Sequence, residues 1–306
     1  MSVAELEARE VALEAPSGLW REAWRRLRSN PAAIVGFVLV GIFLLAAIFA
    51  PLIAPEDPRG AGVDDLLQRC GGVCCPGPSA EHPFGLDDQG RDVFSRVVYG
   101  ARFSLLIGIV AVAVGLSVGL VFGAIAGYFG GWVDSLIMRL TDIMLSIPGL
   151  LLAIGLVAAL GQGLWQIMVA VGVTQIPIFA RLLRGSILAT READYVLAAR
   201  SVGVRRLSIL GSHILPNSLS PVIVQGTLAL ATAIIDVAGL GFLGLGPPDP
   251  STPEWGTMLT DTTRYLQSAP HLALIPGAAI VISVLGFNLI GDGLREALDP
   301  RFRGRA

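Results

Sequence analysis

The segment "LAARSVGVRRLSILGSHILPN", residues 197–217, separates two long apolar stretches and shows how the chain is organised. Three arginines, two glycines and a proline interrupt a connection for which a few residues would suffice. Across the chain, 53% of the residues are apolar and 15% are charged, whereas soluble domains carry about 25% charged residues. The composition therefore predicts an all-α, polytopic membrane protein with this segment outside the bilayer.

Six apolar segments are long enough to cross a bilayer, which takes about 20 residues. The expected transmembrane helices cover 34–54, 103–129, 133–160, 164–182, 217–240 and 272–291. If the N-terminus is cytoplasmic, the inside connections 1–33, 128–142, 181–213 and 291–306 hold 5, 1, 6 and 4 arginines, and the outside connections hold 6. Because arginine-rich connections stay inside, both termini are predicted to be cytoplasmic.

These spans divide the chain into regions with different roles. The predicted regions are a cytoplasmic arm (1–33), a first transmembrane helix (34–54), an external loop (55–102), a five-helix core (103–291) and a cytoplasmic tail (292–306). In the arm, Trp20, Trp24 and Leu27 recur at helical spacing between arginines, which favours an interfacial helix on the cytoplasmic leaflet over a soluble arm.

The core contains a cytoplasmic loop, 184–216, that includes most of the opening segment and is expected to form two short helices. Thr190 is a candidate N-cap of the first helix, and Gly203 suits the left-handed residue that ends it. Four residues of this helix fall at i, i+3, i+4 and i+7 and so share one small apolar face, namely Tyr195, Ala198, Ala199 and Val202. Such a face fits docking of a protein partner, and it equally fits a hairpin folded back on the bundle.

The spacing of this loop resembles the signature of ABC importer permeases, E-A-A-x3-G-x9-I-x-L-P. The matching positions are Ala198, Ala199, Gly203, Leu215 and Pro216, while Leu197 stands at the usual glutamate and His213 at the usual isoleucine. In the dipeptide, oligopeptide and nickel branch of this family, "HILPN" is itself the common form. The presence of His213 therefore favours that branch.

Three other segments are similar to the same branch. They are "HPFGLDDQGRDVFSRVVYGARFSLLIG" (82–108), "GFLGLGPPDPSTPEWGTML" (241–259) and "GFNLIGDGLREALDPR" (286–301). The resemblance covers about residues 20–303 and is strongest to the second permease of dipeptide and oligopeptide importers. It implies a six-helix ABC type I importer permease in a bacterial cytoplasmic (inner) membrane.

The resemblance also implies partners and a mechanism. A second homologous permease would complete the pathway through the lipid bilayer, two ATPase subunits would hold ATP and magnesium, and an external peptide-binding protein would deliver the cargo. The helix at 191–202 would be the coupling helix, seated on an ATPase, with Gly203 allowing the sharp turn after it. No cofactor, metal or nucleic acid is expected on this chain, and nickel or another small solute is the alternative cargo.

Three more residues of the loop complete the predicted coupling site. Arg205 would meet acidic residues of the ATPase, lipid phosphates or only solvent. His213 and Pro216 would belong to the hinge that returns the chain to the membrane.

The external loop offers two kinds of candidate. Asp87, Asp88, Arg91, Asp92 and, beyond it, Trp255 are candidate contacts for the binding protein, although Arg91 and Asp92 could instead pair inside the permease. Cys70, Cys74 and Cys75 are the only cysteines, and an external location favours a disulfide of Cys70 with one of the other two. A metal site that uses His82 as the fourth ligand is the alternative.

Polar side chains inside the spans often line a cavity, because they are costly in lipid. The candidates for the substrate path are Gln175, Gln225, Asp236 and Asn288. Asp236 lies near the outer end of its span, where it would attract a peptide ammonium group or a cation. Hydrogen bonds between helices are the alternative role for all four.

Two sequence patterns bear on whether the chain is an enzyme. "GLSVG" at 115–119 has the G-x-S-x-G pattern of a hydrolase nucleophile around Ser117, but it sits in an apolar span rather than at a strand-to-helix turn. The glycines at positions 115, 119, 123 and 127 instead predict close helix packing. The sequence contains no P-loop, so ATP hydrolysis is assigned to partner subunits and the chain is predicted not to be an enzyme.

Overall fold

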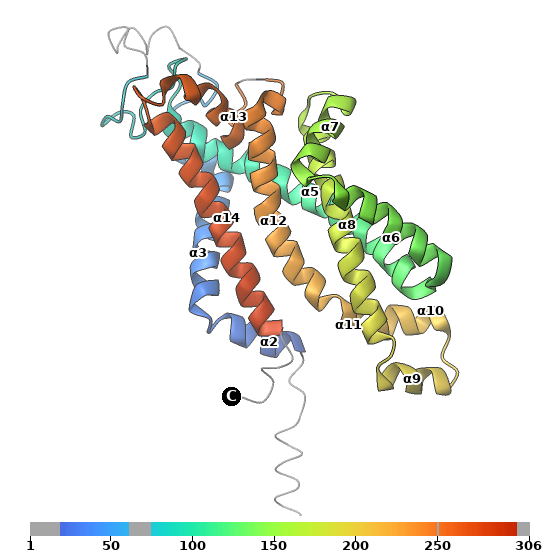
Figure 1. Cartoon of the computed structure of the whole chain (residues 1–306). Helices are drawn as coiled ribbons and strands as arrows, with labels where there is room; N and C mark the ends of the chain where they lie inside the picture. Colours follow the sequence, from blue (N-terminus) through green and yellow to red (C-terminus); the bar gives the residue numbers. More distant parts are fainter. Residues whose placement is uncertain (1–18, 61–74, 250, 299–306) are drawn as a thin grey trace, which may run out of the picture.

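The structure is a computed structural model that describes residues 19–60, 75–249 and 251–298 (Figure 1). In order, its longer helices are α2 (Leu19–Leu27), α3 (Pro31–Ile53), α5 (Val93–Phe129), α6 (Gly131–Ser146), α7 (Gly149–Leu160), α8 (Leu164–Thr190), α9 (Asp194–Ser201), α12 (Ser220–Leu240) and α14 (His271–Leu298). Shorter elements are α10 (Arg206–Ile209), α11 (Leu215–Ser218), α13 (Trp255–Thr260), two π-helical turns, η1 (Leu210–Ile214) and η2 (Gly241–Leu245), and the 3-10 turn η3 (Asp261–Tyr265). The predicted all-α fold is confirmed for these described ranges.

Five helices, α3, α5, α8, α12 extended by η2, and α14, are long and apolar enough to cross a membrane. The sixth predicted span is not one straight helix, because α6 and α7 are bent by 94° relative to each other. The bend lies at Ile147, whose backbone is extended (φ −97°, ψ 129°) before Pro148. A residue before proline is pushed out of the helical region, which explains why the expected continuous helix over 133–160 was wrong.

The glycine stripe of α5 packs against α8, as predicted. A Cβ added at Gly119 would lie 2.6 Å from Cβ of Phe179, and one at Gly123 would lie 2.6 Å from the carbonyl oxygen of Ala180. The matching residues increase together along both helices, so α5 and α8 run parallel. Side chains of both helices, including Ile107, Phe179 and Leu183, contribute to the largest buried apolar cluster.

A second group of helices, α3, α12 and α14, packs around Val40, Ile234 and Phe287. At its cytoplasmic end α2 lies against α14 (Figure 1), with Ala23 and Leu27 buried beside Ala297. Trp24 of α2 is 55% exposed. The predicted amphipathic helix therefore exists, and part of its apolar face covers α14 instead of lipid.

Two helices are longer than expected. α5 begins at Val93, because Asp92 caps it by accepting a 2.7 Å hydrogen bond from the Ser95 backbone N–H. α8 continues to Thr190, whose hydroxyl donates to the Ser186 carbonyl. The expected role of Thr190 as a cap of the next helix was therefore wrong, and α9 begins after Ala193 without a side-chain cap.

Candidate coupling surface and pathway residues

The cytoplasmic loop forms two helical segments outside the bundle (Figure 1). The first is α9. The second runs from Arg206 through the π-helical turn to Ser218, so Pro216 lies in the first turn of α11 rather than after the end of a helix. Val196, Ile209 and Ile214 of these segments are buried in the same apolar cluster as the core of α8. The loop is therefore fixed to the bundle on one side.

The other side of the loop exposes several apolar side chains among polar ones. Tyr195 is 45%, Leu197 44%, Val202 79% and Leu207 71% exposed. Ala198 is exposed as well. We call these five residues the coupling surface. Ala199, expected on this surface, is only 9% exposed and lies in the buried cluster with Val196, because these two residues form the side of α9 that faces the bundle.

The turn after α9 has the predicted geometry. Gly203 has φ +80°, a conformation that costs about 1 kcal/mol or more for other residues. Arg205 and Pro216 are exposed, and His213 is half-buried. The ring Nδ1 of His213 lies 2.8 Å from the hydroxyl of the adjacent Ser212, and its role in a hinge stays a prediction.

The four substrate-path candidates lie on three helices, with Gln175 on α8, Gln225 and Asp236 on α12, and Asn288 on α14. Gln175 is buried where α5 crosses α8, and its Oε1 accepts no hydrogen bond. The other three are partly exposed. Among the described residues, no hydrogen bond joins any two of the four, so their role in the path stays a prediction.

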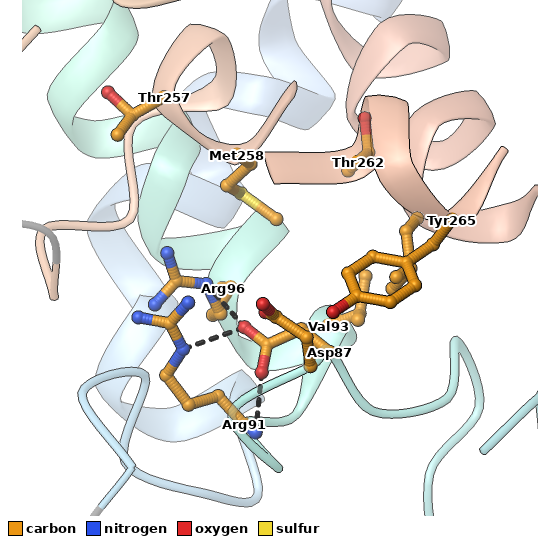
Figure 2. A pocket seen from close by; sticks show the side chains of 10 residues that line it. Asp87, Arg91, Val93, Arg96, Thr257, Met258, Thr262 and Tyr265 are labelled. Carbon is orange, nitrogen blue, oxygen red and sulfur yellow. Dashed lines mark hydrogen bonds and ion pairs between the residues drawn. The ribbon is translucent and has the colours of Figure 1, made fainter. Parts of the chain in front are cut away.

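Three of the external candidates, Asp87, Asp88 and Arg91, line a cavity of about 40 Å³ (Figure 2). Asp87 accepts a 2.7 Å hydrogen bond from Nε of Arg91, and Nε of Arg96 lies 3.6 Å from the same carboxylate oxygen. Both arginines are buried. Arg91 does form an ion pair inside the permease, and the partner in this pair is Asp87. Asp92 is 1% exposed and caps α5.

Only part of the predicted binding-protein surface is therefore at the surface. Asp87 and Asp88 are partly exposed at the rim of this cavity. Trp255 is fully buried, stacks edge-on against Phe43 and donates a 3.0 Å hydrogen bond from Nε1 to the Val97 carbonyl. Trp255 joins the external loop to α3 and α5 and offers no surface to a partner.

Glu254, beside Trp255, is a site that the sequence analysis missed. It is 1% exposed and accepts hydrogen bonds from the backbone N–H groups of Gly256 and Thr257 and from the hydroxyls of Thr257 and Ser104. Burial raises the pKa of Glu254 above its ordinary value, and these four donors oppose that rise. A short glycine–proline-rich loop gave no sign that its one glutamate would join α5 to α13.

The cysteine prediction is largely outside the described residues, which include neither Cys70 nor Cys74. Cys75 is buried against Val93, Ala269 and Leu272. Within the described ranges, no group of three or more histidine, cysteine, aspartate and glutamate side chains is placed to hold a metal ion. The disulfide stays a prediction.

Comparison with known families gives two matches along the chain. Residues 119–304 match the family described as "Binding-protein-dependent transport system inner membrane component". Residues 18–68 match the "N-terminal TM domain of oligopeptide transport permease C". The first match covers more than half of the chain. The chain belongs to this family of inner-membrane transport permeases.

Two curated relatives cover most of the permease. The dipeptide transport system permease protein DppC of Alkalihalophilus pseudofirmus is 49% identical over 284 residues, which are 93% of this chain and 90% of that protein. The glutathione transport system permease protein GsiD of Escherichia coli O6:K15:H31 is 46% identical over 285 residues, or 93% and 91%. Both are permeases of ABC importers, and this chain is accordingly an ABC importer permease subunit and not itself an enzyme.

A solved structure supports the fold of the permease. A chain of the MetNI methionine ABC transporter in an inward-facing conformation aligns with a TM-score of 0.56 at 21% identity, over 67% of this chain and 96% of that chain. The permease therefore has the type I importer fold. Its family and its apolar helices make it a multi-pass protein of the bacterial inner membrane. Permeases of this family work with a second permease, ATPases and a binding protein.

The remote hydrolase hypothesis receives no support from the structure. The Ser117 hydroxyl donates a 2.7 Å hydrogen bond to the Ala113 carbonyl inside α5. It is therefore engaged with its own helix, and the glycines around it serve the contact with α8.

Proposed function

We propose that this permease imports dipeptides or oligopeptides, with a second permease, two ATPase subunits that hold ATP and magnesium, and an external peptide-binding protein. The peptide cargo is supported by the dipeptide permease that is 49% identical over 93% of the chain. The glutathione permease adds a second peptide-like solute among the relatives. Nickel remains the alternative cargo to be tested directly.

The coupling mechanism is supported by the cytoplasmic loop, which has one side buried in the bundle and the other side exposed. Val196, Ala199 and Ile209 anchor it in the buried cluster of the bundle, while Val202 and Leu207 are more than 70% exposed. An exposed apolar patch outside the membrane marks an interaction surface. An ATPase seated on the coupling surface would move α9 together with the end of α8, because only three residues separate the two helices.

In this mechanism, closure of the ATPase pair on ATP moves both coupling loops. The motion reaches the bundle through the parallel contact of α8 with α5, whose glycines leave no room for the helices to slide independently. A packed interface of this kind transmits a rigid-body shift and favours two discrete arrangements. The pathway would then open alternately to each side of the membrane.

The test is reconstitution of the complete transporter in proteoliposomes. We expect ATP-dependent uptake of a radiolabelled dipeptide only when the binding protein is present, and no uptake of ⁶³Ni²⁺. Liposomes that lack the ATPase subunits are the control. Uptake of nickel without peptide uptake would reassign the cargo, and peptide uptake that needs no ATP would refute the coupled mechanism.

A further inference from the structure

The exposed surface of α6 carries a polar stripe that the function described above does not use. Ser135, Arg139, Asp142 and Ser146 are all exposed. Their spacing of i, i+4, i+7 and i+11 places them on one side of the helix. Eleven residues of helix extend about 16 Å, so the stripe follows most of α6 and ends at the bend beside Pro148.

An arginine from α8 joins this stripe. Arg181 forms an ion pair with Asp142, and the two side chains are 52% and 66% exposed. A second pair between the same helices behaves differently. Arg184 donates two hydrogen bonds to Asp134, at 2.9 and 2.5 Å, and Asp134 is only 16% exposed. The second pair fastens α6 to α8, whereas the first lies open on the surface of the chain.

The position of the exposed Arg181–Asp142 pair along its two helices indicates which surroundings it can have. Asp142 lies 11 residues after the start of α6 and Arg181 nine residues before the end of α8, which corresponds to about 16 and about 14 Å along the helices. α8 is long and apolar enough to cross a membrane, and α6 passes the same test together with α7, from which it is bent by 94°. A charged side chain inside the hydrocarbon costs about 2.5–3.5 kcal/mol or more, so lipid is a poor neighbour for this stripe.

Other surfaces of the chain show what faces lipid. The exposed large side chains of α3, including Ile42, Leu45 and Leu52, are apolar, and α3 contains no charged residue. On α6 itself, Trp132, Leu136, Leu140 and Ile143 form a second exposed stripe beside the polar one. The exposed surface of α6 therefore divides into an apolar side, suited to lipid or to a second permease, and a polar side.

We propose that the polar stripe of α6, together with Arg181, forms a wall of the aqueous translocation path in the cytoplasmic half of the membrane. This inference rests on the proposed function. Arg139, Asp142 and Arg181 carry a net charge of +1, which suits the carboxylate of a passing peptide. The hydroxyls of Ser135 and Ser146 donate to carbonyls of their own helix, so they present acceptor oxygens to water without needing a fixed partner.

The first test measures water access in the assembled transporter. The rate of reaction with a charged methanethiosulfonate reagent is measured for the single substitutions Ser135→Cys and Ser146→Cys. The controls are Leu140→Cys on the apolar stripe and Ile42→Cys on α3. The rate of the wild type, which has its own cysteines, is subtracted from each. We expect both serine positions to react at least about tenfold faster than the two controls in one nucleotide state. Equal, slow reaction of all four positions with and without ATP and vanadate would overturn the proposal, because the stripe would then be covered by protein or lipid.

The second test concerns the charge of the wall. We expect Arg139→Gln to lower uptake of a dipeptide about fivefold or more and to leave uptake of its C-terminal amide within about twofold of wild type. Arg295→Gln, an exposed arginine of α14 outside the stripe, is the matched control and should change neither. Equal losses for both solutes would overturn the carboxylate assignment. Failure of the proposed function itself would look different, since the wild type would then show no ATP-dependent uptake.

Discussion

The contact between α5 and α8 yields the sharpest stability prediction, at Gly119. A Cβ at this position would lie 2.6 Å from Cβ of Phe179, 2.9 Å from the Ile176 carbonyl oxygen and 3.2 Å from the Ala180 nitrogen. No rotamer change relieves these contacts, because all three atoms are fixed by the backbone of α8. The substitution Gly119→Ala therefore forces the two helices apart.

The size of the effect follows from these distances. An ordinary contact begins at 3.4 Å, so the helices must separate by about 0.8 Å at this point, and overpacking of this kind costs about 1–3 kcal/mol. Alanine regains up to about 1 kcal/mol through its higher helix propensity. Gly155→Ala on α7, where a Cβ meets nothing within 4 Å, receives the same propensity gain and no clash, so it is the matched control.

The assay is thermal unfolding of the purified permease in detergent, followed by the loss of the monodisperse chromatographic peak. Gly119→Ala should unfold about 1–3 kcal/mol more easily than Gly155→Ala, which corresponds to about 2–5 °C in the melting temperature for a protein of this size. If the two alanine variants melt together, at or above the wild type, the account of α5 and α8 as a close-packed parallel pair is wrong.

Three further predictions concern the loop, the buried glutamate and the ion pair of α6. Ala198→Trp should abolish ATPase stimulation by loaded binding protein in permease that is still inserted, whereas Ala199→Trp should lower the melting temperature, because Ala199 faces the core. Glu254→Ala should cost about 3 kcal/mol or more, since several buried donors lose their acceptor. Burial raises the pKa of Glu254 from 4.5, so above pH 4.5 the folded protein keeps a proton that the unfolded chain releases. The stability of the wild type should therefore fall as the pH rises above 4.5. In Glu254→Gln, which has no carboxyl group to titrate, the melting temperature should depend less on pH. Asp134→Asn should cost about 1 kcal/mol, discounted for the partial exposure of Arg184; Asp134→Asn and wild type melting together would argue against a structural tie there.

The spans and their packing could be predicted from the sequence because they depend on local composition. The glycines at four-residue spacing in α5 predicted a close helix contact, and Gly119 and Gly123 make it. The bend between α6 and α7 was missed even though Pro148 was visible, since proline is tolerated within many membrane helices. Whether it kinks or breaks a span is decided by the neighbouring helices.

The functional residues were predicted less well where their role depends on what lies opposite. Helical spacing placed Ala199 beside Ala198, but the direction from which the bundle approaches α9 puts one inside and leaves the other exposed. Arg91 and Asp92 are adjacent in sequence and their pairing was one of two alternatives, whereas the turn at Gly90 brings Arg91 back to Asp87. Glu254 accepts hydrogen bonds from its neighbours Gly256 and Thr257, but its link to α5 depends on Ser104, 150 residues earlier, whose hydroxyl comes within 3.3 Å.

The seating of α9 on an ATPase subunit is tested most directly by site-specific photo-crosslinking in the assembled transporter. A photoreactive amino acid is placed in turn at Val196, Leu197, Ala198 and Ala199, and adducts with the ATPase are measured. The exposed positions Leu197 and Ala198 should form adducts, and the inward positions Val196 and Ala199 should not. Adducts that are equal at all four positions, or that appear only at the inward pair, would contradict the coupling surface described for this permease.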